Sequence, residues 1–203
     1  MSEPIVIGRH RLLCGDVTEG AALALMGEER ADVIYSDPPW GPGMLRTFAT
    51  MNSPGSSPRL GWGSFLGSFC RSVADFRKPD APVFVEMGNR WTKDLCDAMA
   101  GEGLYWMRTW EVTYGSKSDP RPSALMLFGP HDVGVTMPSV PHGEAVTVAA
   151  LSAVVQPETI VLDPCTGLGM TARVTHRLGG QFRGTELNAS RLERTANWLR
   201  GRA

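Results

Sequence analysis

Long apolar runs are missing from this sequence: no segment reaches the roughly 18 residues that a membrane-spanning helix needs. The first ten residues, MSEPIVIGRH, lack the basic start and the apolar run of a signal peptide. The four cysteines stand far apart without a CxxC pair, which argues against a zinc site and against a secreted disulfide framework. These absences predict a cytoplasmic protein with reduced thiols that does not enter a membrane.

An excess of positive charge is also absent. The 20 Lys and Arg residues are balanced by 21 Asp and Glu residues, which gives a formal net charge of −1. Dedicated nucleic-acid-binding proteins usually carry a basic excess, so any surface that binds an anion has to be local. The 203 residues contain 42% hydrophobic and 20% charged residues, a composition typical of one globular domain spanning residues 1–203.

The order of expected elements alternates between strands and helices. Short apolar segments predict strands at 11–14, 32–36, 81–87, 104–113, 123–128, 159–162 and 181–185. Apolar residues at helical spacing predict helices at 18–29 (capped by Thr18), 64–76, 92–100, 145–155, about 170–178 and 189–199. Gly, Pro and polar residues predict loops at 41–63, 114–122 and 129–143. This alternation predicts an α/β fold with a mostly parallel sheet and helices on both faces.

The tetrapeptide Asp37-Pro38-Pro39-Trp40 directly follows the strand expected at 32–36, where open α/β sheets bind ligands. Proline has no N–H group, so this turn offers acceptors, above all the Asp37 carboxylate and the Pro38 carbonyl. These two acceptors can take the N–H groups of an amine on a flat ring, while the Trp40 ring stacks on it. The alternative is a strand-ending turn with a tryptophan in the core.

A second turn, DPCTGLGMTA at 163–172, follows the strand expected at 159–162 and opens a helix. Gly167 and Gly169 allow backbone N–H groups to approach a ligand, and a helix N-terminus favours a carboxylate. Glu186 ends the next expected strand, where an acid can accept both ribose hydroxyls of a nucleoside cofactor. The glycines also fit a dinucleotide-binding turn or a plain strand–helix turn.

Together, the DPPW and DPxxGxGxT motifs resemble the S-adenosylmethionine-dependent amino-methyltransferases of nucleic acids. DPPW comes first, as in the circularly permuted β-class order. The resemblance covers nearly the whole chain and implies a Rossmann-like methyltransferase fold, with a seven-stranded sheet that contains one antiparallel strand. It implies a catalytic half at about 1–130 and a cofactor-loop half at about 140–203.

The resemblance also implies roles for individual residues, and it implies no metal. Catalysis is assigned to the DPPW residues Asp37, Pro38, Pro39 and Trp40. S-adenosylmethionine would be held by Asp16, Asp163, Pro164, Cys165, Thr166, Gly167, Gly169, Thr171, Glu186, Leu187 and Asn188. Of these, Asp16 matches the segment that contacts the cofactor adenine, and Glu186 matches the ribose-binding acid.

The sequence departs from the family pattern at two places. Cys165 stands where phenylalanine is usual, and Pro141-His142-Gly143-Glu144 stands where the family has a longer segment with a lysine. A separate target-recognition domain is also missing, so the loops at 41–63, 114–122 and 129–143, a second copy of the chain or a partner protein would supply specificity. The residues expected to face the DNA or the cofactor from these loops are Arg46, Arg59, Lys117, Arg121 and His142.

The expected reaction is methyl transfer from S-adenosylmethionine to the N6 amine of adenine in DNA. Within the family, Asp in the first position with Trp in the fourth goes more often with adenine than with cytosine. Cytosine-N4 methylation, adenine methylation in RNA, a nucleotide-cofactor oxidoreductase and a non-catalytic nucleic-acid-binding subunit are the alternatives.

Overall fold

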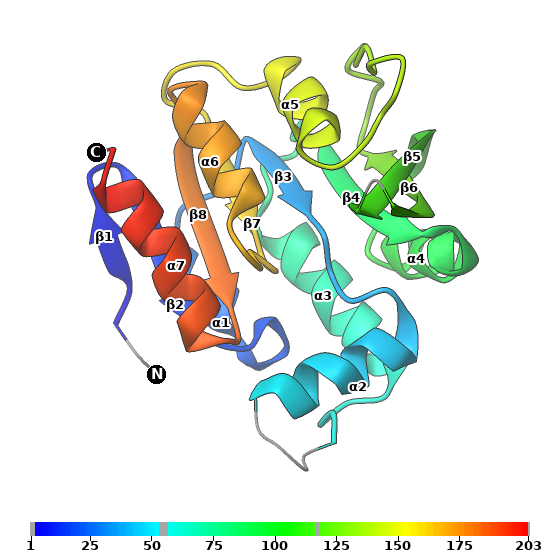
Figure 1. The fold of residues 1–203 in the computed structure, drawn as a ribbon, viewed down its shortest axis with the longest axis horizontal. Helices are drawn as coiled ribbons and strands as arrows, with labels where there is room; N and C mark the ends of the chain where they lie inside the picture. The colour runs from blue at the N-terminus through cyan, green and yellow to red at the C-terminus, as the bar shows by residue number, and fades with distance from the viewer. Residues whose placement is uncertain (1–2, 53–56, 117, 203) are drawn as a thin grey trace.

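The structure is a computed structural model, and it describes residues 3–52, 57–116 and 118–202. The strands within these ranges form one eight-stranded sheet in the order β1-β2-β8-β7-β3-β4-β6-β5 (Figure 1). They are β1 (Ile5–Ile7), β2 (His10–Cys14), β3 (Val33–Ser36), β4 (Val83–Gly88), β5 (Trp106–Ser116), β6 (Asp119–Phe128), β7 (Ile160–Asp163) and β8 (Gln181–Glu186). The prediction of an α/β fold is confirmed.

The expected count of seven strands with one antiparallel member is wrong because of one additional strand. The three-residue β1 pairs antiparallel with β2 and adds an eighth strand, and it is too short to show a hydrophobic period. The one antiparallel strand that was expected is β6, which runs antiparallel to both of its neighbours, β4 and β5. The sheet therefore has two strands, β1 and β6, that oppose the parallel set β2, β8, β7, β3, β4 and β5.

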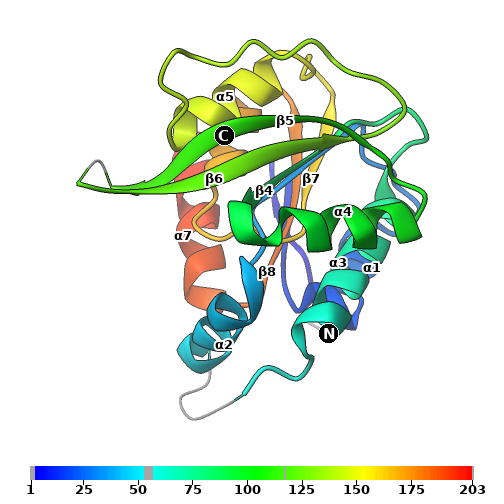
Figure 2. The same ribbon diagram turned by 90° about the vertical axis from the view of Figure 1, so that its right-hand side faces the viewer.

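The helices form two layers around the sheet. They are α1 (Ala21–Met26), α2 (Gly41–Asn52), α3 (Trp62–Phe76), α4 (Thr92–Gly101), α5 (Glu144–Ser152), α6 (Met170–Arg177) and α7 (Ala189–Arg200), with 3₁₀ turns η1 (Val17–Glu19) and η2 (Asn89–Trp91). Figure 2 shows α1, α3 and α4 on one side of the sheet and α5 and α7 on the other. No helix of the described ranges is both long and apolar enough to pass through a membrane.

The central strands are buried on both faces, which explains their continuous apolar sequences. On β3, Ile34 packs in the core that contains Phe69 of α3, while Tyr35 packs in the core that contains Val146 of α5. Such two-sided burial is typical of parallel strands between helical layers. Because β2, β8, β7, β3 and β4 are parallel, their C-terminal ends lie at one edge of the sheet. Helix α2 lies at this edge (Figure 1).

Two of the three expected loops are largely regular structure. The prediction of a loop at 41–63 is wrong for its first twelve residues, which form α2, and residues 53–56 lie outside the described residues. Pro42 is tolerated because the first turn of a helix needs no N–H donor there. The glycines, prolines and serines on both sides of the helix conceal it in the sequence.

The stretch 114–122 belongs mostly to a long β5–β6 hairpin, in which Tyr114 pairs with Arg121 and Thr113 with Pro122. Since β4 ends opposite Ser123, no strand of the described residues pairs with the β4 side of β6 before Ser123, and prolines are accepted at such an edge. The prediction of a loop at 129–143 is confirmed, because these residues form neither helix nor strand.

The helix expected at 18–29 is divided into η1 and α1 by Gly20, whose φ is +82°. Its cap is Asp16 rather than Thr18, since the Asp16 carboxylate accepts from the Thr18 N–H at 2.8 Å and from the Thr18 hydroxyl at 2.7 Å. Asp16 therefore fixes the turn that follows β2.

Candidate functional site

A cavity of about 810 Å³ lies at the C-terminal ends of β2, β8, β7, β3 and β4, beneath α2. Both motifs border it, although they are about 125 residues apart in sequence. Of the residues predicted for the site, the cavity is lined by Asp16, Asp37, Pro39, Arg59, Asp163, Pro164, Cys165, Thr166, Gly167, Thr171, Glu186, Leu187 and Asn188. Parallel strand order thus joins the two motifs in one site.

The turn after β7 is fixed by the buried carboxylate of Asp163. Its Oδ1 accepts from the Ser36 hydroxyl at 2.8 Å and from the Cys165 N–H at 3.0 Å, which ties the end of β3 to the glycine turn. Burial raises the pKa of Asp163 to about 6. Gly169 lies behind the cavity wall rather than in it, and a Cβ there would come within 2.4 Å of Thr195 Oγ1.

Glu186 ends β8 with both carboxylate oxygens held by backbone donors. Oε1 accepts from the Asn188 N–H and Oε2 from the Gly167 N–H, each at 2.8 Å. The side chain is 9% exposed, and burial raises the pKa of this carboxyl above its usual value. Each oxygen retains a lone pair, so the group can accept further hydrogen bonds from a pair of hydroxyls in the cavity.

The DPPW turn is arranged differently from its sequence-based interpretation. The Trp40 indole N–H donates to Asp37 Oδ1 at 2.8 Å, and its ring packs edge-on against Tyr114, with centroids 5.1 Å apart. Pro38 and Trp40 do not line the cavity, whereas Asp37, Pro39 and Tyr114 do. In this structure Trp40 donates to Asp37 without lining the cavity, and Tyr114, which packs against Trp40, is one of four aromatic residues that do line it, with Tyr35, Phe48 and Phe65.

Three further buried side chains at the cavity were missed by sequence reasoning. Glu86 on β4 is 5% exposed and accepts a hydrogen bond from the Tyr35 hydroxyl, which in turn accepts from the Thr147 hydroxyl at 3.1 Å. All three line the cavity. The one available signal was a single acid inside the apolar strand segment APVFVEM. Its partners lie 51 and 61 residues away, so only the fold brings them together.

The cavity is rich in acids that disfavour one another's charge. Burial raises the pKa of Glu86 to about 7 and raises that of Asp37 well above its usual value; the charge of Glu86 adds to the effect on Asp37. Asp163 adds to both shifts. Such a cavity favours a cationic ligand. In the described residues, no cluster of three or more His, Cys, Asp or Glu could hold a metal ion.

Side-chain contacts join α2 and the residues after it, which border the cavity, to the rest of the domain. The Arg191 guanidinium lies 5.0 Å from the Phe48 ring centroid, and Asn188 Nδ2 donates to Asn52 Oδ1 at 2.6 Å. Arg59 forms an ion pair with Glu19. The last contact uses a cation that the sequence predicts to meet phosphate.

The remaining residues expected to face DNA or cofactor do not gather in the cavity. Arg46 is exposed on α2, and Arg121 is exposed on the hairpin, where it contacts Asp119 at 3.4 Å. His142 lies beside the cavity rather than in its lining, with Nδ1 3.0 Å from the Thr113 hydroxyl. Lys117 lies outside the described residues.

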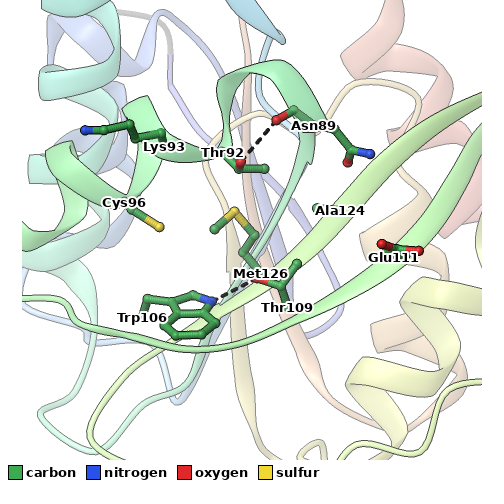
Figure 3. Close-up of a pocket in the computed structure, with 9 residues that line it drawn as sticks. All are labelled: Asn89, Thr92, Lys93, Cys96, Trp106, Thr109, Glu111, Ala124 and Met126. Carbon is green, nitrogen blue, oxygen red and sulfur yellow. Dashed lines mark hydrogen bonds between the residues drawn. The ribbon is translucent and has the colours of Figure 1, made fainter.

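Figure 3 shows a smaller pocket of about 430 Å³ between α4 and the β5–β6 hairpin. None of the predicted site residues lines it. Cys96 lines it, and burial raises the pKa of that thiol above its usual value, which disfavours the thiolate. The chemistry of the chain is concentrated in the larger cavity.

Solved structures provide the comparison, since no family model and no curated protein matches the chain. M1.HpyAVI is 16% identical and matches with a TM-score of 0.67 over 93% of this chain and 97% of its own. The PvuII DNA methyltransferase, which is cytosine-N4-specific, is 13% identical, with a TM-score of 0.67 over 96% and 87%. The chain has the fold of a DNA methyltransferase.

A third structure with this fold is TTHA0409 from Thermus thermophilus, solved in complex with S-adenosyl-L-methionine. It is 15% identical, with a TM-score of 0.65 over 94% of this chain and 93% of its own. M1.HpyAVI has likewise been solved in complex with this cofactor. Identities this low establish a shared fold, so the chemistry has to be argued from the cavity of this chain.

Proposed function

We propose that the protein is an S-adenosylmethionine-dependent DNA methyltransferase that methylates an exocyclic base amine. The observation that carries the proposal is the single cavity bordered by both the Asp37 turn and the Asp163–Glu186 region. Sheet order arranges these groups in line: Asp16 after β2, Glu186 at β8, the glycine turn after β7 and Asp37 after β3. A cofactor bound along this line would present its reactive end to Asp37.

The residues present fit this cofactor. Its two cationic groups suit the acid-rich cavity, and its ribose hydroxyls suit the fixed carboxylate of Glu186. Asp16 and Leu187 border the adenine end, and the turn that contains Gly167 borders the amino-acid end. When bound, the cofactor supplies a methyl group on a sulfonium, an activated leaving group. A dinucleotide of the oxidoreductase alternative would instead bring a diphosphate anion among these acids.

Asp37 would hold the acceptor amine. Its Oδ1 is taken by the Trp40 indole, which leaves Oδ2 to accept one amine N–H. The second acceptor has to come from another group at this end of the cavity, because Pro38 does not line it. Two acceptors on an aromatic amine turn its lone pair out of the ring and toward the methyl group. Orientation of this kind can supply up to about 7–11 kcal/mol. The Tyr114 ring, 36% exposed, is the surface on which we expect the flipped base to stack.

Adenine N6 in DNA is the acceptor that we favour, because the Asp–Trp form of the motif resembles adenine enzymes. Cytosine N4 fits the same geometry, and the PvuII enzyme with this fold is cytosine-specific. A second copy of the chain or a partner protein could complete DNA recognition, since Arg46 and Arg121 are exposed outside the cavity.

Incubation with duplex DNA and methyl-labelled cofactor, followed by nucleoside analysis, tests the proposal. With the parent protein, we expect label in N6-methyldeoxyadenosine. With the Asp37→Asn variant, we expect no label in the DNA. Label in N4-methylcytosine would reassign the base, and label in RNA alone would reassign the nucleic acid. Absence of transfer to either polymer, with NAD bound more tightly than S-adenosylmethionine, would contradict the proposed function.

A further inference from the structure

Glu86 is the acid of the cavity that the proposed reaction does not yet use. In the register of β3 and β4, Ser36 pairs with Val85, so the next residues along the two parallel strands are Asp37 and Glu86. Both line the cavity, and the charge of Glu86 acts on Asp37. Glu86 therefore lies beside the group that would hold the amine, one strand further from the cofactor turn.

One oxygen of the Glu86 carboxyl accepts a hydrogen bond from a neighbouring side chain, and the other is available to a ligand. Oε1 accepts from the Tyr35 hydroxyl, and Tyr35 is fixed in turn by Thr147. Among the described residues, no other hydrogen-bond donor reaches the Glu86 carboxyl. Glu86 lines the cavity, and its carboxyl is not among the buried side-chain groups that lack a partner, so its second oxygen can be reached by a ligand from the cavity.

We propose that Glu86 accepts the proton that the amine loses on methylation, which makes it a catalytic residue of the proposed methyltransferase. The amine lone pair forms the N–C bond while the C–S bond of the sulfonium breaks and leaves its electron pair on sulfur. The nitrogen, now cationic, keeps the electron pair of one N–H bond as the proton moves to Glu86 Oε2. Asp37 holds the second N–H group in place, and the proton passes to water after the product leaves.

The ionisation of Glu86 suits this task. Its pKa is raised to about 7, and a proton acceptor works best when its pKa lies near the working pH. The titratable groups that interact with it are Tyr35 on β3, Asp37 directly after β3, Asp163 at the end of β7 and Tyr114 on β5. None of these four is a cation, so nothing in this set holds Glu86 ionised at acid pH.

The test is single-turnover methyl transfer as a function of pH. In the parent chain we expect the rate to rise with pH through an apparent pKa of about 7. Glu86→Gln keeps the shape of the side chain and an acceptor for Tyr35. We expect it to keep cofactor affinity within about threefold, to lower transfer about 10²-fold or more, and to remove the rise near pH 7. Glu111→Gln, an exposed change on β5, is the matched control and should behave as the parent.

The Tyr35→Phe variant provides a second test, in which the pH dependence of methyl transfer changes without a loss of activity. The Tyr35 hydrogen bond lowers the pKa of Glu86, so its removal should move the rise in rate to higher pH by about one unit. A parent that methylates, with a Glu86→Gln variant of unchanged rate and profile, would overturn the role of Glu86 alone. A Tyr35→Phe profile that does not move would overturn it also. A parent that transfers no methyl group would overturn the proposed function, and the proton role that rests on it.

Discussion

The two ends of the cavity are built by different means. At the cofactor end, the Glu186 carboxylate is held by two backbone N–H groups, and Asp163 is held by a backbone N–H and a hydroxyl. At the acceptor end, Asp37 and Glu86 are each held by a side chain, Trp40 and Tyr35. The cofactor end is therefore held mainly by backbone N–H groups, whereas the acceptor end is held by side-chain donors, one within the DPPW turn and one on the neighbouring strand.

The largest effect is expected from Asp37→Ala at the acceptor end. It removes the acceptor for the amine while leaving the glycine turn and Glu186 in place. Methyl transfer should fall by about 10²-fold or more, the usual scale for one preorganised group, with cofactor affinity unchanged. Turnover and calorimetric affinity measured on one preparation check this. Parent-like turnover by a folded variant would contradict the assignment of Asp37 to the acceptor amine.

Glu186→Ala should produce the opposite pattern. The change removes the acceptor of the ribose hydroxyls and leaves the N–H groups of Gly167 and Asn188 without their partner. Cofactor binding should weaken by about 1.5–3 kcal/mol, the scale of hydrogen bonds to charged groups. Titration calorimetry checks this, with Glu186→Gln as the milder control. Unchanged affinity would place the ribose elsewhere in the cavity.

Alanine substitutions of two glycines, one in the glycine turn and one in α2, are expected to change stability in opposite directions. Gly169 has a φ of +77° and would bring a Cβ against Thr195, so Gly169→Ala should lower the free energy of unfolding by about 2 kcal/mol. Gly43 lies in α2 with open space around it, and Gly43→Ala should raise stability by up to about 1 kcal/mol. Denaturant unfolding of both variants measures the difference, and equal effects would contradict it.

The last expected effect is on stability and depends on pH. Because the pKa of Asp163 is raised to about 6 in the folded chain, this group contributes stability below its unfolded pKa of 3.8, and that stability is lost as the pH rises through 6. Asp163→Asn does not ionise, so it should be more stable than the parent by about 2 kcal/mol at pH 7 and nearly equal at pH 4. Unfolding measured at both pH values, without cofactor, checks this; a gap independent of pH would rule it out.

Most of the sheet and the cofactor end could be predicted from the sequence, because those features are local. The strand at β7, the glycine turn and Glu186 follow from short patterns, and the DPPW turn is recognisable as part of the same site. The acceptor end is less predictable. Trp40 is expected from the sequence to stack on the ligand, whereas in the structure its indole N–H donates to Asp37 and its ring does not line the cavity. Tyr114 and Glu86 reach the cavity only because the hairpin and β4 are neighbours in the sheet.

The order of the strands also gives the distance between the two ends of the cavity. Neighbouring strands lie about 4.8 Å apart, so the four intervals from β2 to β4 measure about 19 Å along the cavity edge. A free nucleoside placed between Asp16 and Glu186 spans only the first part of that length. Glu86 lies at the far end of that length, one strand beyond Asp37. The spacing of the strands thus leaves room at the Glu86 end for a second molecule beside the first.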